Sequence, residues 1–317
     1  MKVLANDGIS NSGKEKLTEN GFELIETKVA QEQLVKYINE NNIVALLVRS
    51  ATQVKKDVID GCPNLKLIGR GGVGMDNIDV DYAESKGIHV INTPNASSDS
   101  VAELVFAHIF SGSRFLYDSN RNMPLEGDSK FKALKKSYAN STEIKGKTIG
   151  IIGFGRIGRA VAKRALGLGM AVIFHDSHHQ EKQTIRLEFI EGKFLEFVVK
   201  PKKLDELLSA ADFISIHLPA QKNAVIGEAE LSKMKTTSGI INTSRGGLID
   251  EVALVDALDN GKLAFAGLDV FEDEPSPAIK VLMNPRISLS PHIGGSTLEA
   301  QQRIGLELAN QMIEILK

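Results

Sequence analysis

The stretch that decides the fold reads TIGIIGFGRIG and spans residues 148–158 of this 317-residue chain. Its first five residues are apolar or small and predict a buried strand, which runs directly into the glycine pattern G-x-G-x-x-G. A helical stretch follows to about Leu168, and a second apolar run over residues 171–175 ends at Asp176. Strand, glycine turn, helix, strand and acid in this order predict a dinucleotide-binding site.

The three glycines of the turn and the helix after them have separate physical roles in such a site. Gly153 permits the tight turn, Gly155 lets a pyrophosphate approach the backbone, and Gly158 lets the helix pack closely on the strand. The N-terminus of the helix offers free N–H groups and the positive end of the helix dipole to the phosphates.

The acid at the end of the second strand bears on which dinucleotide is bound. Asp176 can accept hydrogen bonds from both ribose hydroxyls, and its charge would repel a 2′-phosphate, so the sequence predicts NAD rather than NADP. Three histidines lie close by, at positions 175, 178 and 179. A positive charge on them would make the site more tolerant of a 2′-phosphate, which weakens this preference.

The same alternation of apolar runs and amphipathic stretches fills the rest of the chain. Further strands are predicted at residues 3–5, 22–25, 43–48, 65–68, 88–91, 212–217, 238–242, 263–268 and 286–290. Helices are predicted near residues 11–19, 30–40, 54–61, 79–86, 97–116 and 296–317. Continuous apolar strands separated by helices are typical of parallel sheets covered on both faces. The sequence thus predicts an α/β fold of two doubly wound, Rossmann-like parallel-sheet domains with a cleft between them.

The pattern also predicts where the domains divide. We expect a discontinuous substrate-binding domain over residues 1–96 and 291–317, and an NAD-binding domain over residues 97–290. Two chain crossings would form a hinge, and closure of the domains would exclude water from the reaction. Residues 117–146 are polar, carry many lysines and are weakly periodic, so we expect an irregular connection there.

One segment departs from the alternation of strands and helices. Apolar and charged residues alternate over residues 184–199, with Gly192 in the middle, and this pattern predicts a β-hairpin. A surface excursion without a role in the chemistry is the favoured interpretation, and a subunit or regulatory contact is the alternative.

Composition excludes several classes of protein. Lys and Arg number 38 and Asp and Glu number 40, so the net charge is −2 and the basic excess of a phosphate-neutralising nucleic-acid binder is missing. The single cysteine, Cys62, excludes an intrachain disulfide and a metal site built from cysteines. The N-terminus lacks the pattern of a signal peptide and no apolar run could cross a membrane, so we expect a cytoplasmic protein without a membrane or metal partner.

Three later segments each place polar residues directly after an apolar strand. The segments span residues 239–247, 266–275 and 287–295. They carry Arg245, Asp269, Glu274 and His292. Because ligands of an open parallel sheet bind beyond the carboxyl ends of its strands, we expect these side chains to converge on one crevice.

These residue types suit hydride transfer from an alcohol. Neutral His292 can take the hydroxyl proton and return it in the reverse direction. A carboxylate such as that of Glu274 fixes the tautomer of the imidazole and favours its charged form. Arg245 can grip a substrate carboxylate or polarise a carbonyl through its fixed N–H donors.

Together these segments resemble the D-isomer-specific 2-hydroxyacid dehydrogenases over essentially the whole chain. The elements that carry the resemblance include Asn-x-x-Arg-Gly at 242–246, Glu-Pro at 274–275 and Ser-Pro-His-x-Gly-Gly at 290–295. The resemblance implies the same catalytic residues, Arg245, Glu274 and His292. It also implies that Asp269 faces the nicotinamide carboxamide. Beyond the three glycines of the turn, it implies cofactor contacts from Arg156, Ile157, Asp176, Leu218, Thr243, Ser244, Asp269, His292, Gly294 and Gly295.

Within the family, residues 48–52 and 69–79 look most like the D-3-phosphoglycerate dehydrogenase branch. The residues that this resemblance assigns to the substrate are Arg49, Ser50, Arg70, Gly72, Val73 and Gly74. Glycines permit a concave nest of backbone N–H groups that binds a carboxylate, and arginines supply fixed positive charge for a phosphate.

The expected function is therefore NAD-dependent oxidation of D-3-phosphoglycerate to 3-phosphohydroxypyruvate, the first step of serine synthesis. A homodimer is implied by the family, with the apolar helix over residues 97–116 in the interface. The C-terminal regulatory domains of longer relatives do not follow, so we expect no serine feedback through such a domain. The alternatives are a glyoxylate or hydroxypyruvate reductase and, from another class, an NAD-sensing scaffold similar to the C-terminal-binding-protein corepressors.

Overall fold

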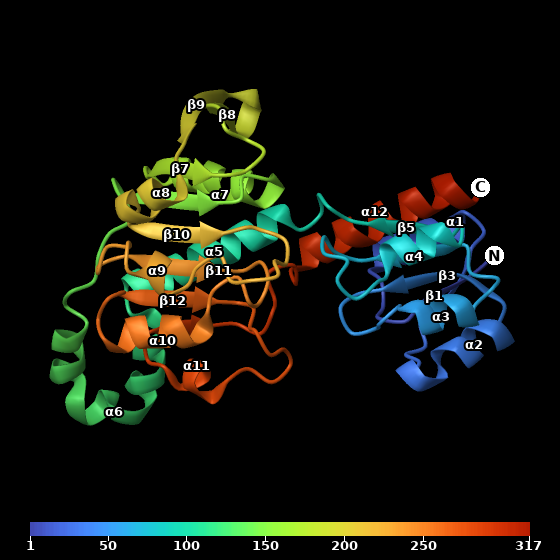
Figure 1. Cartoon of the computed structure of the whole chain (residues 1–317), viewed down its shortest axis with the longest axis horizontal. Coiled ribbons are helices and arrows are strands. Elements are labelled where there is room, and N and C mark those ends of the chain that lie inside the picture. The colour runs from blue at the N-terminus through green and yellow to red at the C-terminus, as the bar shows by residue number, and fades with distance from the viewer. The chain divides into compact units, whose positions relative to one another are not determined.

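The computed structural model describes residues 1–317 as two compact units, each built on its own sheet (Figure 1). Unit 1 comprises Met1–Ser100 and Gly295–Lys317, and unit 2 comprises Val101–Gly294. Both sheets are doubly wound and largely parallel, which confirms the predicted fold class. No helix in either unit combines the length and the apolar character needed to cross a bilayer.

Unit 1 contains a five-stranded sheet in the order β2-β1-β3-β4-β5, with every neighbouring pair parallel. Its strands are β1 (Lys2–Ala5), β2 (Glu23–Ile25), β3 (Ile43–Val48), β4 (Leu67–Arg70) and β5 (His89–Asn92). Its helices are α1 (Asn11–Glu19), α2 (Leu34–Glu40), α3 (Lys56–Gly61), α4 (Val80–Ser85) and α12 (Leu298–Leu316), with a 3₁₀ turn η1 (Gln31–Gln33) before α2.

The side chains of this sheet alternate between two apolar layers, as the two-residue period of a strand requires. Leu4 and Leu46 belong to the layer that also contains the buried residues of α2, α3 and α4. Val3 and Leu47 belong to the other layer, which α1 and α12 complete. The helix α12 thus closes a core that begins with the third residue of the chain.

Unit 2 contains an eight-stranded sheet in the order β13-β12-β11-β10-β6-β7-β9-β8. Its strands are β6 (Thr148–Ile152), β7 (Ala171–His175), β8 (Gln183–Glu188), β9 (Phe194–Pro201), β10 (Phe213–Ile216), β11 (Gly239–Asn242), β12 (Phe265–Leu268) and β13 (Ile287–Leu289). Its helices are α5 (Ser98–Ser113), which begins at the end of unit 1, α6 (Leu116–Ser137), α7 (Arg156–Gly167), α8 (Leu204–Ala210), α9 (Glu228–Leu231), α10 (Glu251–Asp259) and α11 (Ile279–Met283), with a 3₁₀ turn η2 (Ile190–Gly192).

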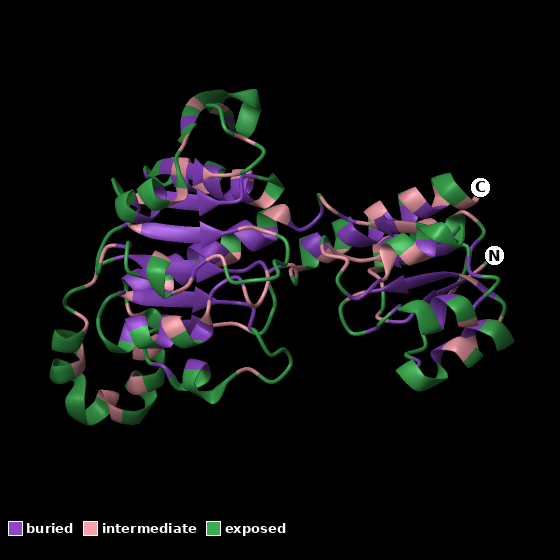
Figure 2. Cartoon of the chain, in the orientation of Figure 1, coloured by how far each residue is buried: buried purple, intermediate pink, exposed green.

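Two apolar layers cover this sheet, and both are visible as buried segments in Figure 2. One layer joins the strands to α8, α9, α10 and α11. The other joins them to α5 and α7, and here Phe154 stacks on Phe174 with ring centroids 4.0 Å apart. The apolar residues of α5, such as Val105 and Ile109, are buried within this layer. Packing inside the chain thus buries part of this helix, whereas Phe110 on the same helix stays exposed, so its place in a subunit interface remains a prediction.

The prediction of an irregular connection over residues 117–146 is wrong for most of its length, because α6 occupies Leu116–Ser137, and only residues 138–146 are irregular. Pro124 lies inside this helix and Lys130 has non-helical dihedral angles, so the helix is kinked and its period is obscured in the sequence. It contains no buried residue, which leaves little apolar periodicity to detect. Helix-favouring residues and the i,i+4 ion pair between Lys130 and Glu126 support it instead.

The predicted hairpin over residues 184–199 is present and consists of the antiparallel strands β8 and β9. It is also part of the main sheet, because β9 pairs in parallel with β7 through Ile173 and Lys200. In Figure 1 the hairpin extends the sheet beyond β7 and projects from unit 2.

Candidate active site

The glycine turn between β6 and α7 leaves space where a pyrophosphate is expected. A Cβ on Gly153, whose φ is +91°, would lie 2.3 Å from the carbonyl oxygen of His217. A Cβ on Gly158 would lie 2.2 Å from the carbonyl oxygen of Gly153, whereas one on Gly155 would meet nothing within 4 Å. Two glycines are thus needed for close packing, and the third faces open space at the N-terminus of α7.

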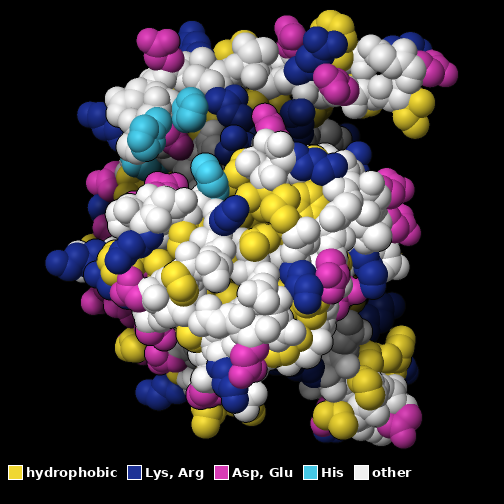
Figure 3. All heavy atoms as spheres, turned by 90° about the vertical axis from the view of Figure 1, so that its right-hand side faces the viewer, with side chains coloured by type: hydrophobic (Ala, Val, Ile, Leu, Met, Phe, Trp, Pro, Cys, Tyr) yellow, Lys and Arg dark blue, Asp and Glu magenta, His cyan; other side chains and the backbone are white.

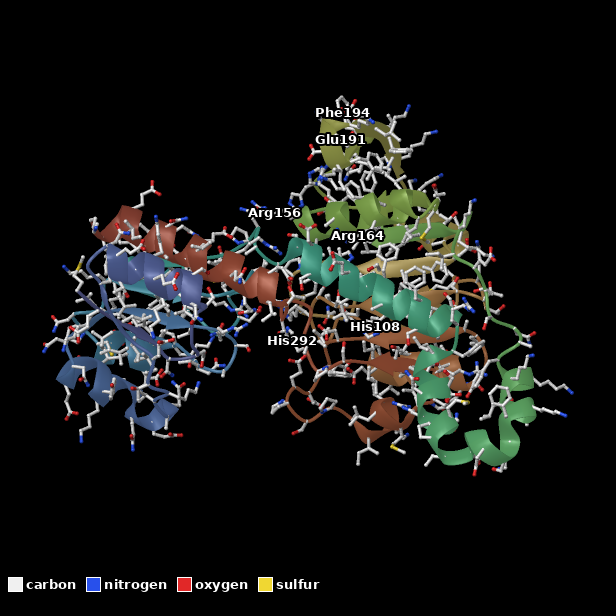
Figure 4. All side chains as sticks on the ribbon, turned by 180° about the vertical axis from the view of Figure 1, so that it is seen from behind. His108, Arg156, Arg164, Glu191, Phe194 and His292 are labelled. Atoms are coloured by element: carbon white, nitrogen blue, oxygen red, sulfur yellow. The ribbon has the colours of Figure 1, made fainter.

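The cofactor residues that start α7 lie next to this space. Arg156 is the first residue of the helix and is exposed, as Figure 4 shows, and Ile157 is half-buried. No side chain caps the helix, so the first backbone N–H groups of α7 are available to an anion.

Asp176 lies directly beyond β7 and is held by the turn itself. Its Oδ2 accepts a hydrogen bond from Phe154 N at 2.6 Å, and its Oδ1 accepts from the backbone N–H groups of His178 and His179. The ring Nδ1 of His179 lies 3.1 Å from the same Oδ1. Burial alone would raise the pKa of Asp176, but these hydrogen bonds lower it to about 2. The group is therefore an anion at neutral pH, as repulsion of a 2′-phosphate requires.

Two buried polar atoms beside this turn have no partner within the chain. They are Nδ1 of His217, just after β10, and Oγ1 of Thr243, just after β11. The next residue, Ser244, donates its hydroxyl to Ile216 O, and Leu218 is half-buried. Unpaired polar atoms at the carboxyl ends of adjacent strands, with His217 packed against Gly153, fit a polar ligand such as NAD.

His292, which the sequence predicts to act as acid and base, follows β13, and Glu274 follows the neighbouring strand β12. His292 Nδ1 lies 2.8 Å from Glu274 Oε2, and Glu274 Oε1 accepts from Phe271 N. Donation from Nδ1 leaves Nε2 as the ring nitrogen that can take a proton. His292 has a φ of +54°, and its backbone N–H donates to Asp269 O. The backbone and the ring of His292 are thus each held by a hydrogen bond.

Asp269 organises this turn through a buried carboxylate. Its Oδ1 accepts from Ser290 Oγ at 2.6 Å and from Ile293 N at 2.8 Å, and its Oδ2 accepts from Gly294 N at 2.8 Å. Burial raises the pKa of Asp269 despite these bonds and the nearby His292. Gly295, the next residue along, belongs to unit 1.

Arg245 follows β11, the strand beside β12. Its Nη1 donates to Ser244 O at 2.7 Å, and Asn242 Nδ2 donates to Arg245 O at 2.8 Å. The next residue is packed so closely that a Cβ on Gly246 would lie 1.7 Å from Phe271 O. Arg245, Asp269 and Ser290 thus follow three neighbouring strands at one edge of the unit 2 sheet.

Sequence reasoning missed a residue that supports this edge from behind. His108, on α5, places Nδ1 2.9 Å from Ser288 Oγ and Nε2 3.0 Å from Ser290 Oγ (Figure 4). Burial lowers the pKa of His108 to about 4, so the ring is neutral. The available signals were a lone histidine on an apolar helix and two serines at the two-residue period of β13.

The residues assigned to the substrate form a group within unit 1, after β3 and β4. Arg70 Nε donates to Asn77 Oδ1 at 3.1 Å, and Asn77 Nδ2 donates to Arg49 O at 2.7 Å. Gly72 has a φ of +150°, and a Cβ there would lie 2.4 Å from Arg70 Nη1. Ser50 and Val73 are exposed, and Gly74 is half-buried. The Asn77 amide thus links the two arginine segments.

Comparisons with known proteins agree with this geometry. Residues 106–294 match the family described as D-isomer specific 2-hydroxyacid dehydrogenase, NAD binding domain. The chain is 39% identical over 321 residues to a hydroxypyruvate reductase of Thermotoga maritima, covering 99% of this chain and 98% of that protein. It is also 39% identical to a D-3-phosphoglycerate dehydrogenase of Methanocaldococcus jannaschii, but it spans only 58% of that protein's length.

A solved structure shares the fold over the whole chain. A NAD-dependent formate dehydrogenase from Staphylococcus aureus in complex with NAD is 28% identical, with a TM-score of 0.80 over 100% of this chain and 96% of that one. The chain belongs to the D-isomer-specific 2-hydroxyacid dehydrogenases and is an NAD-dependent member of that family.

Proposed function

We propose that this enzyme oxidises D-3-phosphoglycerate to 3-phosphohydroxypyruvate. The observation that carries the proposal is the pair of arginine segments in unit 1, which are tied together through Asn77. The Arg70 side chain is held by its bond to Asn77, and arginine side chains suit an anion with two charged groups, a carboxylate and a phosphate. The identity to a D-3-phosphoglycerate dehydrogenase over the whole chain supports the same substrate.

In this proposal the two units have different roles. Unit 1 binds the substrate through Arg49, Ser50, Arg70 and the turn at residues 72–74, and unit 2 holds the cofactor and the acid–base pair. Bound NAD supplies the hydride acceptor. His292 Nε2 takes the hydroxyl proton, and Glu274 stabilises the imidazolium that forms. Arg245 orients the carboxylate or carbonyl of the substrate.

A hydroxypyruvate reductase is the second candidate. The relative with this activity matches the chain over nearly its full length, whereas the D-3-phosphoglycerate dehydrogenase is much longer. The same residues would run the reaction in reverse, with protonated His292 donating to the carbonyl oxygen.

The deciding experiment follows NADH absorbance with 3-phosphohydroxypyruvate, hydroxypyruvate, glyoxylate and pyruvate. We expect kcat/KM for the phosphorylated acid to exceed that for hydroxypyruvate at least ~100-fold, since a phosphate gripped by arginine contributes about 3 kcal/mol. Arg70→Met should remove most of this preference while changing the hydroxypyruvate rate little. Equal or better turnover of hydroxypyruvate would establish the second candidate. Negligible turnover of all four acids together with retained NADH binding would favour a scaffold role.

A further inference from the structure

The strand β8 forms a free edge of the unit 2 sheet. It is the last strand in the sheet order and pairs only with β9, in antiparallel register from Gln183↔Val199 to Glu188↔Phe194. A free edge presents a row of unpaired backbone N–H and C=O groups to which another strand can add. The hairpin that carries it projects from the unit (Figure 1).

The register identifies which backbone groups of β8 face outward. Phe189 N donates to Lys193 O at 2.7 Å, so the backbone N–H of Phe189 points toward β9. In an antiparallel ladder this direction alternates along the strand, so Ile185 and Leu187 also bond to β9. The N–H and C=O groups of Arg186 and Glu188 therefore point away from β9, toward the free edge.

The side chains at this edge carry opposite charges. Arg186 and Glu188 are both exposed and lie 3.5 Å apart, and the guanidinium of Arg186 lies over the ring of Phe194. Leu187, between them, is turned to the other face of the sheet and is buried. Charged residues of both signs interleave with hydrophobic ones on the hairpin, as the top of Figure 3 shows.

We infer that β8 pairs antiparallel with β8 of a second copy of this chain, about a two-fold axis at Leu187. This register places Arg186 opposite Glu188 of the second copy and Glu188 opposite Arg186 of the second copy, and each pair exchanges two backbone hydrogen bonds. Leu187 meets its own counterpart, and Ile185 faces Phe189 of the second copy. Oppositely charged residues directly across a ladder stabilise it.

The alternation of charge is what selects a second copy as the occupant. Charges on an edge strand normally prevent pairing, because like charges meet. Centring the axis on Arg186 would have that effect, since arginine would face arginine. Centring it on Leu187 makes the edge complementary to itself, as a two-fold interface requires. Five exposed apolar side chains lie on the hairpin: Phe189, Ile190, Phe194, Leu195 and Val198.

A cysteine cross-link tests the register directly. Leu187 would face its counterpart in a non-hydrogen-bonded pair with Cα atoms about 4.5 Å apart, within the range of a disulfide. The only native cysteine, Cys62, lies in the core of unit 1, so Leu187→Cys adds the only thiol on the hairpin. Thr184→Cys is the matched control, because its two copies would lie six residues apart along the strand, about 20 Å. Mild oxidation should give a disulfide-linked dimer with Leu187→Cys and not with Thr184→Cys.

Charge reversal tests the same interface without a cross-link. Arg186→Glu should lower the molar mass measured by light scattering at micromolar concentration by at least half, and the double variant Arg186→Glu/Glu188→Arg should restore it. Lys193→Glu, an equal charge change on the same hairpin, should leave the mass unchanged. Equal masses for the wild type and Arg186→Glu, or no selective cross-link at position 187, would overturn the inference.

Discussion

Nε2 of His108 lies 3.0 Å from Ser290 Oγ, and through Ser290 this contact links helix α5 to the carboxylate of Asp269, which holds the turn after His292. Ser290 donates its only hydroxyl hydrogen to Asp269, so it must accept from His108. The proton of the neutral ring therefore sits on Nε2, and Nδ1 accepts from Ser288. One tautomer satisfies the whole chain of hydrogen bonds, which makes His108 a positioning residue for the turn at 292–294.

Replacing His108 should therefore affect the cofactor more than the chemistry. We expect His108→Leu to raise KM for NADH about fivefold, the effect of losing about 1 kcal/mol of hydrogen bonding, with a smaller change in kcat. His108→Gln, which can donate and accept, should recover part of the loss. Ser288→Ala should have a weaker effect than Ser290→Ala, because Ser288 reaches Asp269 only through the ring. Equal effects on KM and kcat would contradict this assignment.

Buried neutral histidines should make the protein sensitive to mild acid. Burial lowers the pKa of His108 to about 4 and that of His217 to about 3, against 6.5 in the unfolded chain. Below pH 6.5 the unfolded state binds these protons and the folded state does not, so stability falls as the pH falls from 6.5 toward 4. At pH 5 we expect each histidine to cost about 2 kcal/mol of unfolding free energy.

Urea unfolding at pH 7.5 and pH 5 measures this effect. The stability difference between the wild type and His108→Gln should shift by about 2 kcal/mol in favour of the variant on going to pH 5. A difference that does not change with pH would mean that the pKa of His108 is not lowered in the folded protein.

Two glycines of the turn between β6 and α7 should respond differently to replacement by alanine. Gly155→Ala should fold normally and bind NADH at least ~10-fold more weakly, because its methyl group would enter the open space in front of α7. Gly158→Ala should lower the melting temperature, because its methyl group would collide with Gly153 O. Isothermal titration and thermal unfolding of both variants separate these effects. Equal loss of stability in the two variants would be inconsistent with an open pyrophosphate site.

Asp176 should set the choice of cofactor. Asp176→Ala removes the charge that repels a 2′-phosphate, and it also frees the backbone N–H groups of His178 and His179 to meet an anion. We expect the ratio of kcat/KM for NADH to that for NADPH to fall at least ~10-fold, with Asp176→Asn intermediate. An unchanged ratio would reject the ribose assignment.

The pair of His292 and Glu274 should control turnover rather than cofactor binding. His292→Ala should lower kcat ~10²–10⁴-fold and leave the Kd for NADH within about threefold of the wild-type value. Glu274→Gln keeps a hydrogen-bond acceptor beside Nδ1 but removes the charge, so it should have a smaller effect on kcat. Near-normal turnover by His292→Ala would remove it from the acid–base role.

The fold was predictable from the sequence because its determinants are local. Apolar runs such as Ile43–Val48 mark buried parallel strands, and the glycine turn at 153–158 marks the start of α7. The helix α6 was not predictable in the same way, because Pro124 and the lack of a buried face hide its period. The joining of β9 to β7 depends on register across the sheet, which no local pattern encodes.

The site was predictable only in part, for a similar reason. His292, Glu274 and Asp269 stand out because each follows a predicted strand. In the structure, hydrogen bonds join the segment after β12, with Asp269 and Glu274, to the segment after β13, with His292. The contribution of His108 depends on the packing of α5 against β12 and β13. Gly267, on β12, leaves room for the His108 side chain. A contact between residues 182 positions apart leaves no periodic signal in either segment.

The helix α12 has a consequence for how the protein is made. Leu308, Ala309 and Met312 fill the same core as Val3 and Ala5, whereas unit 2 is a continuous stretch of chain between them. At ~5–20 residues per second, a ribosome needs roughly 10 to 40 s to synthesise that stretch. During this interval only α1 packs on the sheet face that α12 later completes, so this nascent segment is where we expect chaperones to act.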